Sequence, residues 1–469
     1  MAFKLPFRVW IGVVIFMTTF TNYVLRVNIS ISALAMSTPR QVTESDDRPT
    51  VAPSECLPDT TKTTKTREAG DEGFFAKAEW SETEQGQVLA GYGYGYIISS
   101  IPGGFFAEYF GPWKTIVWSM LISIIATFLC IPANLVHWSV VMVMRVILGL
   151  MGGLHYPALQ NLIARWAPPK EKGKFMSAMF GNTMGTVMTF AVVGAISDVA
   201  NWAWGFVFVG GFTIFYLIFV AIVLADSPDQ SRWCSDEEKE FLRSEIPPPR
   251  AKLVAPYKKI FTSIPFWGLA ICHFANLWGL FILLITVPKF FKDYLDFSLK
   301  ESGALSAMPH ICRLFAGFLY GSINDFFTKR AFCSMTIQRK CFVIVSHVMP
   351  GLCLIMMMFL NCDSRIGTAL LCMTLFFNAA VICTTIYNPQ DLAPNFAATV
   401  YGIISTIGGI SQFLVPVSSA VMTKSGNTMD QWRWVFVLAG AIFMVGATAF
   451  IILGSTNRQS WNEPEQKDA

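Results

Sequence analysis

Long apolar stretches alternate with short polar ones along almost the whole chain. A helix rises about 1.5 Å per residue, so roughly 20 apolar residues cross the ~30 Å hydrocarbon core of a bilayer. Twelve stretches reach that length: residues 9–36, 85–110, 114–133, 137–166, 173–197, 202–225, 264–288, 302–323, 340–360, 366–387, 396–422 and 432–454. The pattern predicts an all-α membrane protein with twelve transmembrane helices. The first stretch contains Arg26 and Asn28 and lacks a small-residue cleavage site, so we expect a retained span and not a signal peptide.

Two similar segments lie about half the chain length apart. Residues 104–114 and 321–330 each hold a glycine, an acid four positions later and then bases, and each lies between two apolar stretches. This spacing is expected of a duplicated membrane domain, here two pseudo-symmetric six-helix bundles. Glycine would let helices approach closely, the acid would complement a helix N-terminus, and the bases would hold the loop on the cytoplasmic side. The residues that we expect to act in gating at these loops are Gly104, Glu108, Gly111, Lys114, Gly321 and Asp325.

The loops between the spans set the expected topology. The predicted N-terminal bundle spans residues 1–225 and includes an outer polar loop at 37–82. A cytoplasmic linker at 226–262 leads to the C-terminal bundle at 263–454, and a cytoplasmic tail follows at 455–469. Bases in short loops mark the cytoplasmic side. Most fall on one side: Lys4, Arg8, Lys114, Lys170, Lys172, Lys174, Arg250, Lys252, Lys258, Lys259, Lys329, Arg330, Arg339 and Lys340. Both termini therefore face the cytosol, and the lack of an acidic dileucine signal before the first span favours the plasma membrane over lysosomal or vesicular membranes.

Composition excludes several classes of protein. With 53% hydrophobic and 14% charged residues among 469, a soluble fold would need a core far larger than one domain builds. The net charge of +4 is small and scattered, so no nucleic-acid partner is expected. Most of the 11 cysteines fall inside apolar spans without metal-like spacing. Phosphate-loop, zinc-protease and serine-hydrolase motifs are missing, so we expect neither an enzyme nor a bound cofactor.

Ionisable residues inside the spans are candidates for a transport pathway, because burying a charge in hydrocarbon is costly. In the first span, Asn22 and Arg26 lie four residues apart and share a helix face. We expect a substrate or gating role there. The alternatives are a structural pair with a carboxylate or a side chain that reaches the interface.

The fourth span offers a second basic face. Arg145, Gly149, Gly152 and Tyr156 fall within about 60° of one another at 100° per residue. A guanidinium beside bare backbone and a phenol could bind a carboxylate or phosphate through its two-pronged fork. The alternative is a close helix contact through Gly149 and Gly153 that involves no ligand.

Other candidates are weaker. Arg313 and His310, three residues apart in the eighth span, form a third basic spot or a packing pair. His273 in the seventh span and His155 in the fourth could relay protons together with His310, although a lone histidine inside a membrane more often packs and hydrogen-bonds. The residues of the second span that could line a pathway are Tyr92 and Tyr96, whose neighbours Gly91 and Gly95 also predict close packing.

Several segments together resemble the anion/cation symporter family of the major facilitator superfamily, which contains sodium/phosphate cotransporters, sialin and vesicular glutamate transporters. The segments are Tyr23-Val-Leu-Arg26-Val-Asn28, Tyr94-Gly-Tyr96, Ile101-Pro-Gly-Gly104, Tyr156-Pro-Ala, Leu305-Ser-Ala-Met-Pro309, Asn388-Pro-Gln-Asp391 and Gln459-Ser-Trp461-Asn462. The resemblance implies the major facilitator fold, alternating access and a central anion site in which Arg26 and Arg145 match the family's intramembrane arginines.

The chain departs from the family at two positions. Many members carry an acid in the fourth helix where this chain has Gly152, and a histidine where it has Pro389. His155 is a candidate substitute for the acid, although it lies about 80° from the face of Arg145. We expect a monomeric secondary transporter in the lipid bilayer that moves a small organic or inorganic anion, coupled to Na⁺ or H⁺. The alternatives are an uncoupled facilitator of a neutral solute, an anion channel or a transport-dead sensor.

Overall fold

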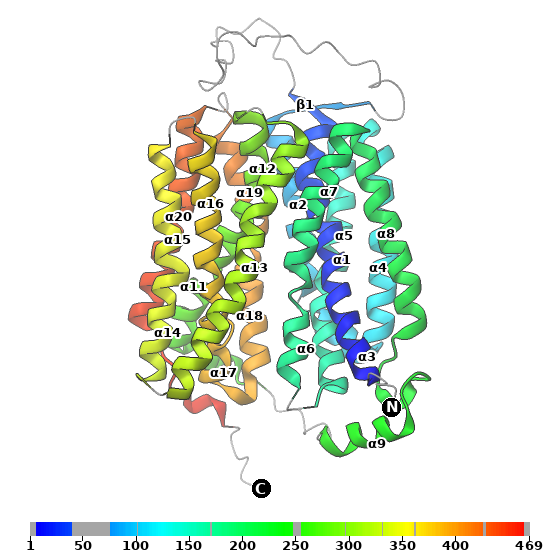
Figure 1. Ribbon diagram of the computed structural model, residues 1–469, viewed down its shortest axis with the longest axis vertical. Coiled ribbons are helices and arrows are strands. Elements are labelled where there is room, and N and C mark those ends of the chain that lie inside the picture. Colours follow the sequence, from blue (N-terminus) through cyan, green and yellow to red (C-terminus); the bar gives the residue numbers. More distant parts are fainter. Residues whose placement is uncertain are drawn as a thin grey trace, which may run out of the picture. The chain divides into compact units, whose positions relative to one another are not determined.

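The computed structural model describes residues 6–39, 76–100, 102–168, 171–246, 255–295, 297–330, 332–360, 363–424 and 428–463. These residues form two compact units (Figure 1). The first contains the described residues up to 246 together with 298–304. The second contains 255–295, 297 and the described residues from 305 onward.

The first unit is a helical bundle. Its helices are α1 (Phe7–Met36), α2 (Glu82–Ser100), α3 (Pro102–Tyr109), α4 (Pro112–Val136), α5 (Trp138–Trp166), α6 (Lys172–Ala178), α7 (Gly181–Val199), α8 (Trp202–Val223), η2 (Pro228–Gln230) and α9 (Asp236–Glu245). Two short strands, β1 (Ser37–Pro39) and β2 (Ala78–Trp80), pair in parallel, with Ser37 opposite Ala78.

The second unit is also helical. Its elements are α10 (Tyr257–Thr262), α11 (Ile264–Phe281), η3 (Ile282–Thr286), α12 (Val287–Lys289), η4 (Phe290–Tyr294), α13 (Leu299–Arg330), α14 (Met335–Val343), η5 (Ile344–Val348), α15 (Met349–Met356), η6 (Met357–Phe359), α16 (Ser364–Asn378), η7 (Ala379–Cys383), α17 (Asn388–Leu392), η8 (Pro394–Phe396), α18 (Ala397–Gly409), α19 (Ser411–Met422), α20 (Met429–Leu453) and η9 (Ser460–Asn462). The first residues of α13 belong to the first unit.

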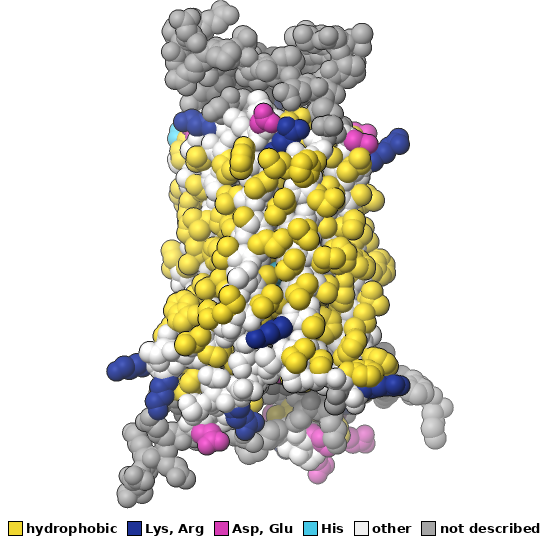
Figure 2. All heavy atoms as spheres, turned by 90° about the vertical axis from the view of Figure 1, so that its left-hand side faces the viewer, with side chains coloured by type: hydrophobic (Ala, Val, Ile, Leu, Met, Phe, Trp, Pro, Cys, Tyr) yellow, Lys and Arg dark blue, Asp and Glu magenta, His cyan; other side chains and the backbone are white. Residues whose placement is uncertain are grey.

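Nine helical segments of the described residues are long and apolar enough to cross a bilayer. They are Phe7–Met36, Pro112–Val136, Trp138–Trp166, Trp202–Val223, Ile264–Tyr294, Met335–Phe359, Ser364–Leu392, Thr399–Met422 and Met429–Leu453. The other three predicted spans coincide with α2 and α3, with α6 and α7, and with α13, which are helical but do not meet the same measure. On the face drawn in Figure 2, exposed hydrophobic side chains cover the middle, and most charged side chains lie towards the two ends.

Glycines allow two helix pairs of the first unit to pack backbone to backbone. A Cβ atom built on Gly95 of α2 would overlap the carbonyl oxygen of Val146 in α5, and one on Gly149 would overlap that of Tyr92. Gly181 of α7 lies equally close to the carbonyl oxygen of Phe16 in α1. Only glycine leaves room for such contacts. Between helices in lipid there is no hydrophobic driving force, so close van der Waals packing of this kind stabilises the pair instead.

The two repeated segments differ from the expected loops. Gly321 and Asp325 lie inside α13, which continues to Arg330 without a loop. A Cβ on Gly104 or Gly321 would meet no atom of the described residues within 4 Å, so the close helix approach predicted at these glycines was wrong. The side chain of Asp325 lies outside the described residues.

Gly111 does shape the first segment. Its φ of 88° lies in the left-handed region that side chains disfavour. A Cβ there would also overlap the carboxylate of Asp226, whose Oδ1 accepts a hydrogen bond of 2.7 Å from the backbone N–H of Trp113. Asp226 thereby complements the N-terminus of α4, whereas Glu108 and Lys114 are exposed.

The linker helix α9 is fastened to the start of α1. Ser235 caps α9 by accepting a hydrogen bond from the backbone of Glu238. The Glu238 carboxylate accepts from the backbone N–H groups of Phe7 at 2.7 Å and Arg8 at 3.1 Å. Arg8 also pairs with Glu238 and, at 2.8 Å, with Glu171. The first part of the linker therefore packs with the first unit.

Candidate anion site

Arg26 lies deep in the first unit, and its guanidinium lies over two phenol rings. The side chain is 6% exposed. Its Cζ lies 4.8 Å from the ring centroid of Tyr92 in α2 and 5.1 Å from that of Tyr23 in α1. Rings over a guanidinium stabilise its charge by cation–π attraction. A carboxylate or phosphate oxygen would bind at the N–H edge of such a guanidinium.

Arg145 of α5 contacts the same phenol but uses its fork on the backbone of α1. Its Nη2 donates to the carbonyl oxygen of Arg26 at 2.8 Å, and its Nη1 to that of Leu25 at 3.4 Å. Its Cζ lies 5.4 Å from the ring of Tyr92. Nε is buried and has no hydrogen-bond partner among the described residues. Arg145 thus ties α5 to α1 beside Arg26. These two bonds leave the N–H of Nε and the second N–H of each Nη unused.

Tyr92 connects the members of this arginine cluster. Its hydroxyl donates a hydrogen bond of 3.2 Å to Oδ1 of Asn22, and its ring stacks on Tyr96 with centroids 6.1 Å apart. A Cβ on Gly152 would overlap the Tyr92 hydroxyl. The phenol therefore fills the space that a side chain at position 152, such as the family's acid, would need. The structure confirms the close helix contact through Gly149 and Gly153. Anion binding at the face of Arg145 stays a prediction.

Tyr156 lies further along α5. Its hydroxyl accepts a hydrogen bond of 3.3 Å from Nδ2 of Asn182 in α7. The candidate residues for the anion site in the first, second and fourth spans all belong to the first unit: Asn22, Arg26, Tyr92, Tyr96, Arg145 and Tyr156.

The three candidate histidines do not join this cluster. His155 is 1% exposed and lies 3.3 Å from the hydroxyl of Ser119 in α4, through Nε2. His273 of α11, in the second unit, lies 3.1 Å from the hydroxyl of Thr385 through Nδ1. His310 and Arg313 lie one turn apart on α13, also in the second unit.

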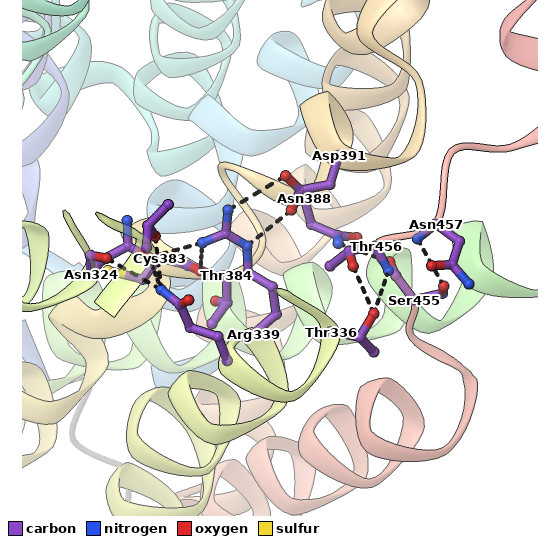
Figure 3. Close-up of polar contacts among 12 residues, drawn as sticks. Asn324, Thr336, Arg339, Cys383, Thr384, Asn388, Asp391, Ser455, Thr456 and Asn457 are labelled. Carbon is purple, nitrogen blue, oxygen red and sulfur yellow. Dashed lines mark hydrogen bonds and ion pairs between the residues drawn. The ribbon is translucent and has the colours of Figure 1, made fainter. Parts of the chain in front are cut away.

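The sequence did not reveal a buried ion pair in the second unit (Figure 3). Arg339 of α14, predicted as a base of a short cytoplasmic loop, is 4% exposed. Its Nε pairs with Asp391 of α17 at 2.9 Å, and its Nη1 donates to Oδ1 of Asn324 at 2.9 Å and to the carbonyl oxygen of Cys383 at 2.8 Å. The signal was present as Asp391 in Asn388-Pro-Gln-Asp391, but nothing in the sequence named its partner 52 positions away.

Figure 3 also shows how the start of the predicted tail is held beside this pair. Asn388 donates 3.0 Å to the carbonyl oxygen of Ser455, and the hydroxyls of Thr336 and Thr456 lie 2.6 Å apart. These contacts fix residues after α20 to α14 and α17.

A second buried cluster was also missed. His347 in η5 is fully buried, and its Nε2 lies 3.0 Å from the carbonyl oxygen and 3.2 Å from the sulfur of Cys272 in α11. Its Nδ1 lies 2.8 Å from the hydroxyl of Ser346. Among the described residues, no group of three or more His, Cys, Asp or Glu side chains could hold a metal ion.

The model of the Major Facilitator Superfamily matches residues 10–416, most of the chain. The chain belongs to the major facilitator superfamily. Its members are transporters, so the chain is a multi-pass membrane transporter and not an enzyme.

Curated relatives include vesicular glutamate transporter 1 of Xenopus laevis, 28% identical over 83% of this chain and 69% of the relative. Human sialin is also 28% identical, over 96% of this chain and 90% of sialin. The relatives support the anion/cation symporter group to which the sequence motifs pointed.

Solved structures share the fold. A bacterial homologue of the human lysosomal transporter Spinster aligns with a TM-score of 0.65 at 15% identity, covering 96% of this chain and 97% of that one. The xylose transporter of E. coli in an inward-open conformation aligns with a TM-score of 0.66 at 12% identity, covering 95% and 96%. At these identities the likeness concerns the fold alone.

Proposed function

We propose that this protein is a secondary active transporter of a small organic or inorganic anion, a carboxylate or a phosphate. The observation that carries the proposal is the cluster of two buried guanidiniums in the first unit, Arg26 and Arg145, around Tyr92. Burying two positive charges close together in a membrane protein is costly, and a bound anion would offset that cost. The name of the vesicular glutamate transporters, which are among the relatives, supports an anionic substrate.

The two arginines have different proposed roles. Arg26 would bind the anion through the N–H edge of its guanidinium, which is buried beside the rings of Tyr23 and Tyr92. Arg145 would position Arg26, because both of its Nη groups donate to α1. It would offer the anion only the N–H groups that these two bonds leave unused, Nε among them. Asn22, Tyr96 and Tyr156 would complete the polar lining, and alternating access of the two units would carry the anion across.

Coupling to Na⁺ or H⁺ is part of the proposal. Moving an anion into a negatively charged compartment costs about 2.3 kcal/mol per charge per 100 mV, which a coupled cation can supply. Because position 152 is a glycine, the carboxylate that many family members carry there can have no part in coupling. His155, His273 and His310 remain the proposed proton carriers. An uncoupled carrier is the second candidate, because position 152 lacks the acid.

The membrane and the assembly complete the proposal. The name of the glutamate transporters refers to vesicles, so the plasma-membrane preference drawn from the sequence gains no support from these relatives. We propose that a single chain forms the pathway, as two units of one polypeptide suffice for alternating access.

The test is uptake of labelled phosphate, glutamate, sialic acid and urate into proteoliposomes under an imposed Na⁺ or pH gradient. Arg26→Gln should raise the KM of the transported anion about 10- to 100-fold, since hydrogen bonds to a charged group contribute about 1.5–3 kcal/mol. Arg365→Gln, an exposed arginine at the start of α16, is the control and should leave uptake unchanged. Uptake that is insensitive to Arg26→Gln would contradict the site, and uptake driven equally well without either gradient would favour the uncoupled carrier.

A further inference from the structure

The cytoplasmic end predicted for α13 carries a cluster of exposed aromatic rings. Phe326, Phe327 and Phe332 are 50%, 39% and 59% exposed. Their ring centroids lie 5.6–6.0 Å apart, so the three rings form one patch. The patch follows directly on the predicted apolar span 302–323, which places it at the depth where a bilayer changes from hydrocarbon to headgroups.

Two exposed bases accompany these rings. Lys329 and Arg330 are both exposed, and the Cζ of Arg330 lies 4.9 Å from the ring centroid of Phe326. That contact holds one positive charge over the aromatic surface. Over residues 325–332 the sequence holds one acid and two bases, so this ring–base patch has a net positive charge.

The repeated segment of the first unit provides a natural comparison. Phe105, Phe106, Tyr109 and Phe110 on and after α3 are 41–73% exposed and also contact one another, with centroids 4.8–6.4 Å apart. The charge between these rings is that of Glu108, which is also exposed. A cluster of exposed aromatic rings therefore occurs in both repeated segments, with an acid among the rings in the first and two bases among them in the second.

We propose that the ring–base patch of α13 is a binding surface for the headgroup of an anionic phospholipid. Exposed aromatic rings settle at the interface, and bases beside them attract anionic headgroups by roughly fivefold in affinity per base. The long stems of lysine and arginine can lie along the rings while their charged ends reach the phosphate and carboxylate oxygens.

The experiment uses the full-length protein in nanodiscs of phosphatidylcholine and phosphatidylserine. A bimane label on Cys333, which is exposed next to Phe332, reports nearby lipid through quenching by brominated phosphatidylserine or brominated phosphatidylcholine. Cys56, Cys341 and Cys362 are replaced by serine, and a Cys333→Ser sample gives the background from the other cysteines. The ratio of the two lipids' association constants is the measured quantity.

We expect a ratio of about five or more in favour of phosphatidylserine. Lys329→Gln with Arg330→Gln should bring it to about one, whereas Arg330→Lys should retain it. Lys300→Gln with Arg365→Gln removes two exposed bases elsewhere and should leave the ratio unchanged. A ratio near one in the unsubstituted protein, or an unchanged ratio in the Lys329/Arg330 variant, would overturn the proposal. No transported substrate is needed, so the result is independent of the proposed function.

Discussion

The contact between Tyr92 and Gly152 gives the sharpest test of the arginine cluster. A methyl group at position 152 would occupy the space of the Tyr92 hydroxyl, so Gly152→Ala must push the phenol away. The displaced ring would lose its hydrogen bond to Asn22 and its contacts with Arg26 and Arg145. The substitution therefore acts on both arginines without touching either.

The magnitude follows from those contacts. One hydrogen bond contributes about 1 kcal/mol. Two ring–guanidinium contacts in a desolvated setting add about 1–2 kcal/mol each. Because alanine is the better helix former by about 1 kcal/mol, we expect Gly152→Ala to destabilise the protein by about 2–4 kcal/mol. Gly211→Ala in α8 is the matched control, because a Cβ there meets nothing within 4 Å.

The assay is the free energy of unfolding, measured by titration with SDS, in a double-mutant cycle with Tyr92→Leu. Removing the phenol removes the obstacle, so Gly152→Ala should cost little in the Tyr92→Leu background. Two results would refute the reasoning: a Gly152→Ala protein as stable as Gly211→Ala, or penalties of Gly152→Ala and Tyr92→Leu that simply add.

Three further predictions follow from other contacts. Gly149→Ala should destabilise the protein more than Gly152→Ala, because the new Cβ would overlap the backbone carbonyl oxygen of Tyr92 and the two helices must separate. Equal free energies of SDS unfolding for the two variants would contradict this. Asp391→Asn removes the carboxylate that pairs with the buried Arg339 and should lower the stability of the protein by about 3–5 kcal/mol. Adding Arg339→Met removes the unpaired charge, so the double variant should regain part of that stability, as measured by thermal melting. Burial, with a smaller contribution from nearby Glu238, raises the pKa of the Cys234 thiol to about 11. The rate of alkylation of Cys234, followed by mass spectrometry, should therefore rise about tenfold per pH unit from pH 8 to 10. A plateau of that rate near pH 9 would contradict this.

Much of the fold could be predicted because helices that cross a membrane leave long apolar stretches in the sequence. A ~30 Å apolar core demands long apolar helices, and each predicted stretch coincides with helix in the structure. The end of the eighth span was missed, because Gly321 and Asp325 suggested a loop where α13 continues to Arg330. Glycine followed by an acid permits a turn but does not require one.

The candidate site was only partly predictable. Helical periodicity put Arg145 and Gly152 on one face, and that face does meet Tyr92. Periodicity could not tell that the Nη groups of Arg145 bond to α1, because that depends on how two helices pack. The Arg339–Asp391 pair was missed for the same reason, since it joins two helices that are distant in sequence.

The measurement that tests the central claim most directly is counterflow in proteoliposomes. Vesicles loaded with an unlabelled anion that the protein transports are diluted into a trace of the same anion labelled, and Arg26→Gln is compared with the unsubstituted protein and with Arg365→Gln. A carrier that binds the anion at Arg26 should accumulate label transiently, lose that accumulation in Arg26→Gln and keep it in Arg365→Gln. Fast equilibration without transient accumulation would indicate a channel, and accumulation unchanged in Arg26→Gln would contradict the proposed anion site.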